Sequence, residues 1–278
     1  MMPIHENLTN RVAVITGGSG VLCSKMAVEL ARHGVKIAIL NRTAEKGQEI
    51  VDIIGQTGGT AISIATDVLD RISLENAREK ILETFGRVDL LINGAGGNHP
   101  DAITAPEKYG EDVDGKSFFD LDENGFSQVF ASNFTGTFLA SQVFGKALLQ
   151  VEAPVILNIS SMSSYAPMTK VPAYSAAKAS INNFTMWMAV HFAEEGLRVN
   201  AIAPGFFLTK QNRDLLLNED GSLTARSNKI ITATPMKRFG QPEDLLGTLL
   251  WLVDESYSGF VTGITVPVDG GFMAYSGV

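Results

Sequence analysis

Short runs of apolar residues alternate with helical patterns along most of the chain. The apolar runs are rich in Val, Ile, Leu and Ala and predict strands at 11–16, 35–40, 60–66, 88–93, 155–160, 198–203 and 265–268. Between them, apolar residues recur at helical spacing and predict helices at 20–33, 43–57, 72–85, 123–149, 172–195 and 242–253. Apolar strands that alternate with helices are typical of a mostly parallel sheet with helices on both faces. The pattern therefore predicts a doubly wound α/β fold.

Two segments interrupt this alternation. Residues 97–122 are polar and rich in Gly, Pro and Asp, and residues 206–234 have a mixed composition. Long loops in a compact fold are often functional, so we expect these two segments to surround the substrate. A chain of 278 residues without internal repeats suits one α/β unit, and we expect a single domain over residues 1–278.

Composition and charge narrow the class of partner. The chain carries 22 basic and 30 acidic residues, a net charge of −8, and no basic block. This balance argues against nucleic acid or an anionic membrane as the main partner. The single cysteine, Cys23, allows no internal disulfide, as is usual in a reducing cytoplasm. The first residues lack a basic start and an apolar signal core, so we expect a cytoplasmic protein without a membrane segment.

A glycine-rich turn follows the first predicted strand. Residues 16–23 read TGGSGVLC, and small residues there let the backbone approach a diphosphate at the amino end of the next helix. The expected contacts of that diphosphate are Gly17, Ser19, Gly20, Val21 and Leu22. A glycine cluster by itself is a weak signal, because an ordinary turn between a strand and a helix also uses small residues.

The ends of later strands indicate the rest of a dinucleotide site. Asn41 and Arg42 follow the second strand, where an acidic residue would bind the ribose hydroxyls of NAD. Arg42 can instead bind a 2′-phosphate, which favours NADP(H) slightly over NAD(H), although a solvated arginine also fits the pattern. Asp67 and Val68, after the third strand, suit the adenine edge. The fourth strand ends in small or polar residues beside the expected cofactor path: Asn93, Ala95 and Gly96.

Candidate chemistry lies in the predicted helix that begins at residue 172. Tyr174 and Lys178 are four residues apart and so face the same way. A lysine ammonium beside a phenol favours the phenolate and lowers the tyrosine pKa, which suits a general acid/base for an alcohol–ketone pair. Ser161 follows a strand at the edge where α/β sites gather, and its hydroxyl can bind the substrate oxygen. Ser160 and Ser163 compete for this role, and a Tyr–Lys pair alone is more often an exposed helix face.

In this order and spacing, the features resemble the short-chain dehydrogenase/reductase family over essentially the whole chain. The matching pieces are Thr16-Gly17, Asn93-Gly94-Ala95-Gly96, Asn133, Ser161, Tyr174-Ser175-Ala176-Ala177-Lys178, Arg198-Val199-Asn200 with Pro204-Gly205, and Asp269-Gly270-Gly271. The resemblance implies a Rossmann fold and an NAD(P)(H)-dependent oxidoreductase with a tetrad of Asn133, Ser161, Tyr174 and Lys178. The sequence departs from the family where the later fingerprint glycines would fall, at Val21 and Cys23.

The resemblance also implies roles for single residues and an assembly. Asn133 would hold a water in a proton relay, and Lys178 would bind the nicotinamide ribose. The nicotinamide side of the cofactor site would be formed by Tyr174, Lys178, Pro204, Gly205, Phe207 and Thr209. Members of the family are usually homodimers or homotetramers. The apolar helices at 126–149 and 173–192 are candidate interfaces, although their apolar residues would equally suit packing on the sheet.

Three stretches, residues 18–23, 96–100 and 205–213, narrow the substrate. They resemble the D-mannonate oxidoreductase type within the family, which interconverts D-fructuronate and D-mannonate. The implied substrate is a sugar acid, whose carboxylate and hydroxyls need charged and polar partners. The candidate substrate-binding residues are Asn98, His99, Ser163, Asn212 and Arg213. A histidine or arginine in a loop is, however, more often a surface residue than a ligand.

Two other interpretations stay open. Another reductase of the same family, acting on a gluconate-type ketone or a 3-oxoacyl thioester, would share the tetrad but differ in the loops. A nucleotide-binding sensor without chemistry would keep the cofactor site, and the complete tetrad argues against it. Four scattered histidines and one cysteine show no metal-ligand spacing, and the chain has no Gly-x-Ser-x-Gly motif of a serine hydrolase.

Overall fold

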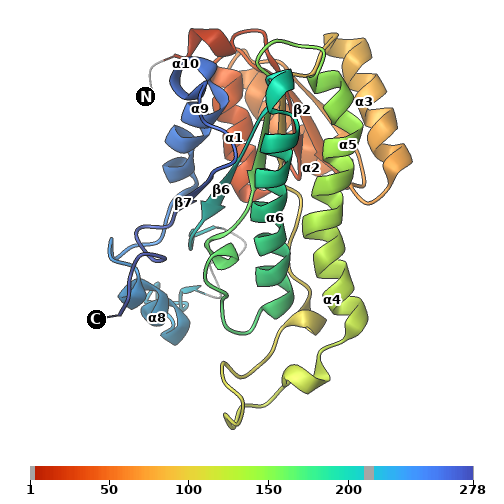
Figure 1. Ribbon diagram of the computed structural model, residues 1–278. Coiled ribbons are helices and arrows are strands. Elements are labelled where there is room, and N and C mark those ends of the chain that lie inside the picture. Colours follow the sequence, from red (N-terminus) through yellow and green to blue (C-terminus); the bar gives the residue numbers. More distant parts are fainter. Residues whose placement is uncertain (1–3, 210–215, 278) are drawn as a thin grey trace.

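A twisted parallel sheet forms the centre of the protein (Figure 1). The computed structural model describes residues 4–209 and 216–277. In these residues the sheet has seven strands in the order β3-β2-β1-β4-β5-β6-β7, and every neighbouring pair is parallel. The strands are β1 (Val12–Thr16), β2 (Lys36–Asn41), β3 (Ala61–Ala65), β4 (Leu90–Asn93), β5 (Val155–Ile159), β6 (Arg198–Pro204) and β7 (Thr265–Val268). The predicted doubly wound Rossmann fold is confirmed.

Helices cover both faces of the sheet because successive strand residues point to opposite sides. Ala13 and Ile15 face α1 (Val21–Arg32), α2 (Ala44–Gln56) and α9 (Leu246–Val253) in one core cluster. Val12 and Val14 face α3 (Arg71–Phe85), α5 (Gly136–Leu148) and α6 (Pro172–His191) in the other. Strands that are buried on both faces must be apolar throughout, which explains the uninterrupted apolar runs in the sequence.

The strand order places the functional edge of the sheet. The chain proceeds outward from β1 through β2 to β3, and then returns to the other side of β1 with β4. Ligands of such sheets bind at the carboxyl ends of the strands where the order reverses. Thr16 pairs with Asn93, and Asn93 pairs with Asn158, so the ends of β1, β4 and β5 lie in one row.

The helix predicted at 123–149 is interrupted in its middle. It consists of α4 (Glu123–Phe130), a π-helical stretch (Ala131–Thr135) and α5. Asn133 lies in that stretch, and its Nδ2 donates to the carbonyl oxygens of Val129 at 2.8 Å and of Gly97 at 2.7 Å. Such π-bulges are frequent at functional sites, and no feature of the apolar spacing reveals this one.

Smaller differences from the prediction lie at helix ends and in the two long segments. The helix predicted at 172–195 ends at His191 and is followed by a 3₁₀ turn (Ala193–Glu195), and a 3₁₀ turn (Pro242–Leu245) precedes α9. Residues 97–122 contain only the short turns Pro100–Ala102 and Phe118–Asp120, and extend beyond the carboxyl edge of the sheet (Figure 1). Residues 206–234 include α8 (Ala225–Ala233), which the apolar pattern did not predict, and α10 (Glu255–Ser258) follows α9.

Candidate active site

The glycine-rich turn between β1 and α1 has the geometry of an anion site. Gly17 has a φ of 64°, and a Cβ built on it would lie 2.9 Å from the Cα of Ala95, so a glycine is required there. No side chain caps the start of α1, and the first intrahelical bond runs from the amide of Ser24 to the oxygen of Gly20. The amides of the first helical turn are therefore directed outward, as a diphosphate would need.

The residues expected to contact adenosine lie at the carboxyl ends of β2 and β3. Asn41 is buried, and its Nδ2 donates to the carbonyl oxygen of Thr43, so its side chain turns toward the start of α2. Arg42 is exposed beyond the end of β2. The Oδ1 of Asp67 accepts a hydrogen bond from the amide of Leu69 at 2.9 Å. Asp67 and Arg42 thus lie at the correct edge of the sheet, whereas the amide of Asn41 faces the protein.

The side chain of Asn93, a residue expected beside the cofactor, takes part in a buried polar network. Its Nδ2 donates to the Oδ1 of Asn158 at 2.9 Å and to the Oγ of Ser141 at 3.1 Å. The Nδ2 of Asn158 in turn donates to the Oγ1 of Thr185 at 2.9 Å. The network joins β4 and β5 to α5 and α6, while the buried Oδ1 of Asn93 has no hydrogen-bond partner among the described residues. Sequence reasoning missed it, although polar residues within apolar strands were a visible signal.

The segment Gly94–Gly97 connects the phosphate turn with the middle of the long helix. The Oγ1 of Thr16 accepts hydrogen bonds from the amides of Gly94 at 3.1 Å and Ala95 at 3.3 Å. Val68, next along the edge, packs where a Cβ on Gly136 would stand, against the start of α5. Gly96 has a φ of 154°, and a Cβ there would overlap the side chain of Asn133. Thr16 matches the family pattern, but the sequence does not indicate that its hydroxyl binds the Gly94–Gly97 segment.

Three of the four predicted catalytic residues meet directly. Ser161 follows β5, its hydroxyl accepts the amide of Ser163 at 3.2 Å, and its side chain lies near enough to Tyr174 to lower the pKa of that phenol. The Nζ of Lys178 donates to the carbonyl oxygen of Ile159 at 2.7 Å and lies 5.7 Å from the centroid of the Tyr174 ring. Buried Ser161 and Lys178 and half-buried Tyr174 therefore form one cluster at the carboxyl end of β5.

Asn133 lies beside this cluster. Val129, one turn before it, packs with Ala173 and Tyr174. The Oδ1 of Asn133 is buried and, among the described residues, has no hydrogen-bond partner. An orphaned buried acceptor is costly unless a water or ligand satisfies it, so this atom fits the expected relay position.

Burial shifts the pKa values of Tyr174 and Lys178. Burial raises the pKa of Tyr174 above its ordinary value, and the hydrogen bond with Ser161 is what opposes the rise. The net shift of the Tyr174 pKa is therefore upward in this structure, and the expected lowering by Lys178 stays a prediction. Burial also lowers the pKa of Lys178 to about 8, because the low dielectric disfavours its charge. Tyr174 is thus a protonated acid at neutral pH.

The competing serines separate clearly. The Oγ of Ser160 donates to the Oδ1 of Asn182 at 2.6 Å, so this hydroxyl is committed to α6. The Oγ of Ser163 is buried and has no partner in the described part of the chain. Ser163 therefore keeps a free hydroxyl two residues from Ser161, as a substrate contact would need.

The remaining predicted residues are distributed over the two long segments. The Nδ1 of His99 accepts the amide of Asp101 at 3.2 Å and so caps a 3₁₀ turn, while Asn98 is exposed. Asn212 and Arg213 lie outside the described residues. The residues expected at the nicotinamide follow β6. Pro204 is the last residue of that strand, and Gly205 packs against Asp269. Phe207 is buried against Gly240, and Thr209 is half-buried.

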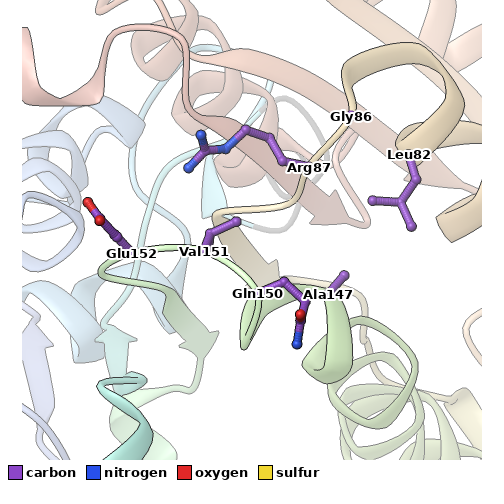
Figure 2. Close-up of a pocket in the computed structure, with 7 residues that line it drawn as sticks. All are labelled: Leu82, Gly86, Arg87, Ala147, Gln150, Val151 and Glu152. Carbon is purple, nitrogen blue, oxygen red and sulfur yellow. The ribbon is translucent and has the colours of Figure 1, made fainter.

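A separate cavity lies at the opposite edge of the sheet. It measures about 590 Å³ and is lined by the ends of α3 and α5 and the loops that follow them (Figure 2). Its lining residues are Leu82, Gly86, Arg87, Ala147, Gln150, Val151 and Glu152. None of the predicted site residues contributes to it, so the cavity is not where the tetrad acts.

Fold, turn and cluster define an oxidoreductase of the short-chain dehydrogenase class that uses NAD(P). The profile of that family, described as short chain dehydrogenase, matches residues 11–220, and the chain belongs to the family. The chain is 77% identical over its whole length, and over the whole relative, to the uncharacterized oxidoreductase UxuB of Bacillus subtilis. Among the described residues, no helix has the length and apolarity that crossing a membrane requires.

Two further relatives bear on the substrate. A crystal structure of a presumed D-mannonate oxidoreductase of Haemophilus influenzae, with NAD bound, has a TM-score of 0.95 at 49% identity and covers 98% of each chain. The 2-dehydro-3-deoxy-D-gluconate 5-dehydrogenase of Dickeya dadantii is 33% identical, over 96% of this chain and 97% of the relative.

Proposed function

We propose that this protein interconverts D-fructuronate and D-mannonate with NAD(H). The observation that supports the reaction class is the grouping of Ser161 and Lys178 around Tyr174, with the Lys178 amine 5.7 Å from the centre of the phenol ring. The observation that supports the substrate is the likeness to the presumed D-mannonate oxidoreductase of Haemophilus influenzae. The likeness extends over 98% of each chain and so includes most of the long segments as well as the core.

In the reductive direction, the chain's own groups bind the ketone and provide a proton. When bound, the nicotinamide supplies the hydride to the carbonyl carbon. The Ser161 hydroxyl donates a hydrogen bond to the carbonyl oxygen, and the Tyr174 hydroxyl gives that oxygen its proton. Hydride and proton together convert the ketone into the alcohol. Because burial raises the pKa of Tyr174, the phenol holds its proton at neutral pH until the oxygen becomes basic.

Lys178 and Asn133 serve the return of the proton. The amine of Lys178 lies below the Tyr174 ring and can replace the lost proton through a chain of hydrogen bonds. The unpartnered Oδ1 of Asn133 can accept from a water in that chain. In the same proposal, Lys178 binds the nicotinamide ribose, and Pro204, Gly205, Phe207 and Thr209 flank the nicotinamide.

The sugar acid would be held by groups at the mouth of the site. The free hydroxyl of Ser163 and the exposed amide of Asn98 offer partners for its hydroxyl groups. His99 uses Nδ1 for the turn at Asp101, so Nε2 is the nitrogen that we propose for a substrate hydroxyl. Arg213 is the proposed partner of the carboxylate, and Asn212 is a further proposed substrate contact.

The cofactor proposal differs from the sequence-based preference. The sequence favoured NADP(H) because Arg42 follows β2 without an acidic neighbour. The Haemophilus influenzae relative holds NAD, and nothing in the comparisons favours NADP. An exposed Arg42 is equally compatible with solvent, so we propose NAD(H) as the working cofactor.

A second copy of the chain is the proposed partner. Helices α4, α5 and α6 expose a row of large apolar side chains, of which Phe126 is 38% exposed, Trp187 55% and Val190 80%. Exposed apolar surface of this kind is typical of subunit interfaces. We propose a homodimer or homotetramer that buries these helices, and a monomer mass in light scattering would contradict it.

The test is the initial rate of D-fructuronate reduction, followed by nicotinamide absorbance, with NADH and NADPH in parallel. 5-Keto-D-gluconate is the matched substrate control, because it is the sugar-acid ketone of a gluconate-type reductase, the alternative function. Turnover of D-fructuronate with NADH, well above both controls, supports the proposal. Preferred turnover of the gluconate ketone would replace the substrate, and preferred use of NADPH would restore the role expected for Arg42.

A further inference from the structure

Gly94 must be a glycine because of space and not because of backbone conformation. Gly17 and Gly96 have φ values of 64° and 154°, whereas Gly94 lies outside the left-handed region. A Cβ built on Gly94 would overlap the Sγ of Cys23 and would stand 3.0 Å from the carbonyl oxygen of Thr16. The side chain of Cys23 therefore occupies the space that a side chain at position 94 would need.

Cys23 acts there through its volume. It is the third residue of α1, is 4% exposed, and belongs to the core cluster on that face of the sheet. Burial raises the pKa of its thiol to about 11, so the sulfur carries no charge at neutral pH. Cys23 is one of the two residues that stand where the family's glycine-rich turn has a glycine. The absence of a side chain at Gly94 leaves room for its sulfur.

The contact joins two parts of the site that act on different ends of the cofactor. On one side lies the first turn of α1, the proposed diphosphate site. On the other side, Gly94 begins the segment whose last residue, Gly97, accepts a hydrogen bond from Asn133 at 2.7 Å. The Oγ1 of Thr16 bonds the amides of Gly94 and Ala95 and reinforces the same junction.

We propose that Cys23 is a positioning residue, whose sulfur packs into the space at Gly94 and sets the Gly94–Gly97 segment relative to the phosphate turn. Through that segment it orients the nicotinamide side of the cofactor and the side chain of Asn133. The proposal rests on the proposed function, because it assumes that this segment borders the cofactor.

The test is a double-mutant cycle with Cys23→Ala, Gly94→Ala and the pair together. When residue 23 is cysteine, the methyl group that Gly94→Ala introduces overlaps the sulfur. When residue 23 is alanine, the nearest atom of that residue is its Cβ at 3.7 Å, which is an ordinary van der Waals contact. We expect Gly94→Ala alone to weaken NADH binding about tenfold and the double variant to recover to within about threefold. The recovery is incomplete because the Thr16 oxygen stays at 3.0 Å.

The readouts separate positioning from simple stability. NADH affinity is measured by fluorescence titration of folded protein and needs no substrate, so it remains valid if D-fructuronate proves to be wrong. Where turnover is available, kcat should fall with Gly94→Ala and recover in the pair, because Asn133 returns to its place. Gly145→Ala is the matched control, since its Cβ meets nothing within 4 Å and should combine additively with Cys23→Ala.

An equal loss from Gly94→Ala in both backgrounds, or no loss in the cysteine background, would overturn the proposal. If Gly94→Ala alone is insoluble, a soluble double variant that binds NADH supports the proposal. A double variant that also fails to fold contradicts it, because removing the sulfur should have removed the overlap.

Discussion

Two regions of the molecule hold their side chains differently: the carboxyl edge of the sheet at β4 and β5, and the segment at 104–122. At the strand ends, Ser161 and Lys178 are buried, and hydrogen bonds orient each of them. In the segment, Tyr109 is 88% exposed and Phe119 77% exposed, and the two rings touch each other edge to face. The first region is held by the core, whereas the second lies outside it.

The difference has consequences for charge. Burial moves the pKa values of Tyr174 and Lys178 because low dielectric disfavours the charged forms. In the long segments, ion pairs such as Lys229 with Glu107, at 3.0 Å, are exposed to water and weaken accordingly. The reactive groups are therefore held within the core, whereas the surrounding segments are held in part by contacts that reach water.

The sharpest test of that division is Tyr174→Phe. Loss of the phenol proton should reduce kcat about 1,000-fold, because general acid catalysis is removed. The ring remains, so NADH should bind to the folded variant within about threefold of the parent affinity. Steady-state rates and NADH fluorescence titration measure the two effects. Near-normal turnover would refute the assigned role of Tyr174.

Lys178→Met tests how much the burial of the Lys178 amine lowers the free energy of unfolding. The pKa of Lys178 falls from 10.5 to about 8 on folding, so the unfolded chain binds more protons between these values. The folded state is therefore penalised below pH 8, by about 3 kcal/mol at pH 7, and the penalty disappears as the pH rises toward 10.5.

Urea unfolding of the cofactor-free protein between pH 6.5 and 10.5 measures that penalty. The variant should be the more stable protein at pH 7, by about 2 kcal/mol once the lost hydrogen bond to Ile159 is counted. Its advantage should shrink as the pH rises, while its turnover is lost throughout. A constant difference across the range would show that the buried charge is not its cause.

The smallest effect is expected from Lys229→Ala, which removes the ion pair between α8 and Glu107. The pair joins the two long segments, but both side chains reach water, so the KM for the sugar acid should rise less than about threefold. The parent value of kcat should be retained. Lys80→Ala, at an exposed pair in α3, is the matched control and should leave KM unchanged. A large fall in kcat would mean that the segments take part in the chemistry.

Much of the candidate site followed from local pattern. Tyr174 and Lys178 meet because residues four apart share a helix face, and Ser161 meets them because strand ends share an edge. Asn133 could be named only by resemblance, since its placement depends on a π-helical stretch that no apolar spacing encodes. The inward turn of Asn41 toward Thr43 was equally invisible, because a side chain at a strand end can face either the ligand or the next helix.

The sequence by itself determined the alternation of strands and helices, the glycine turn and the order of the catalytic residues, because these depend on period, size and spacing along the chain. Only the tertiary structure decided the pKa direction of Tyr174, the commitment of Ser160 to Asn182 and the fit of Cys23 against Gly94. Each of these depends on burial or on contact between residues far apart in the chain, which no local pattern contains.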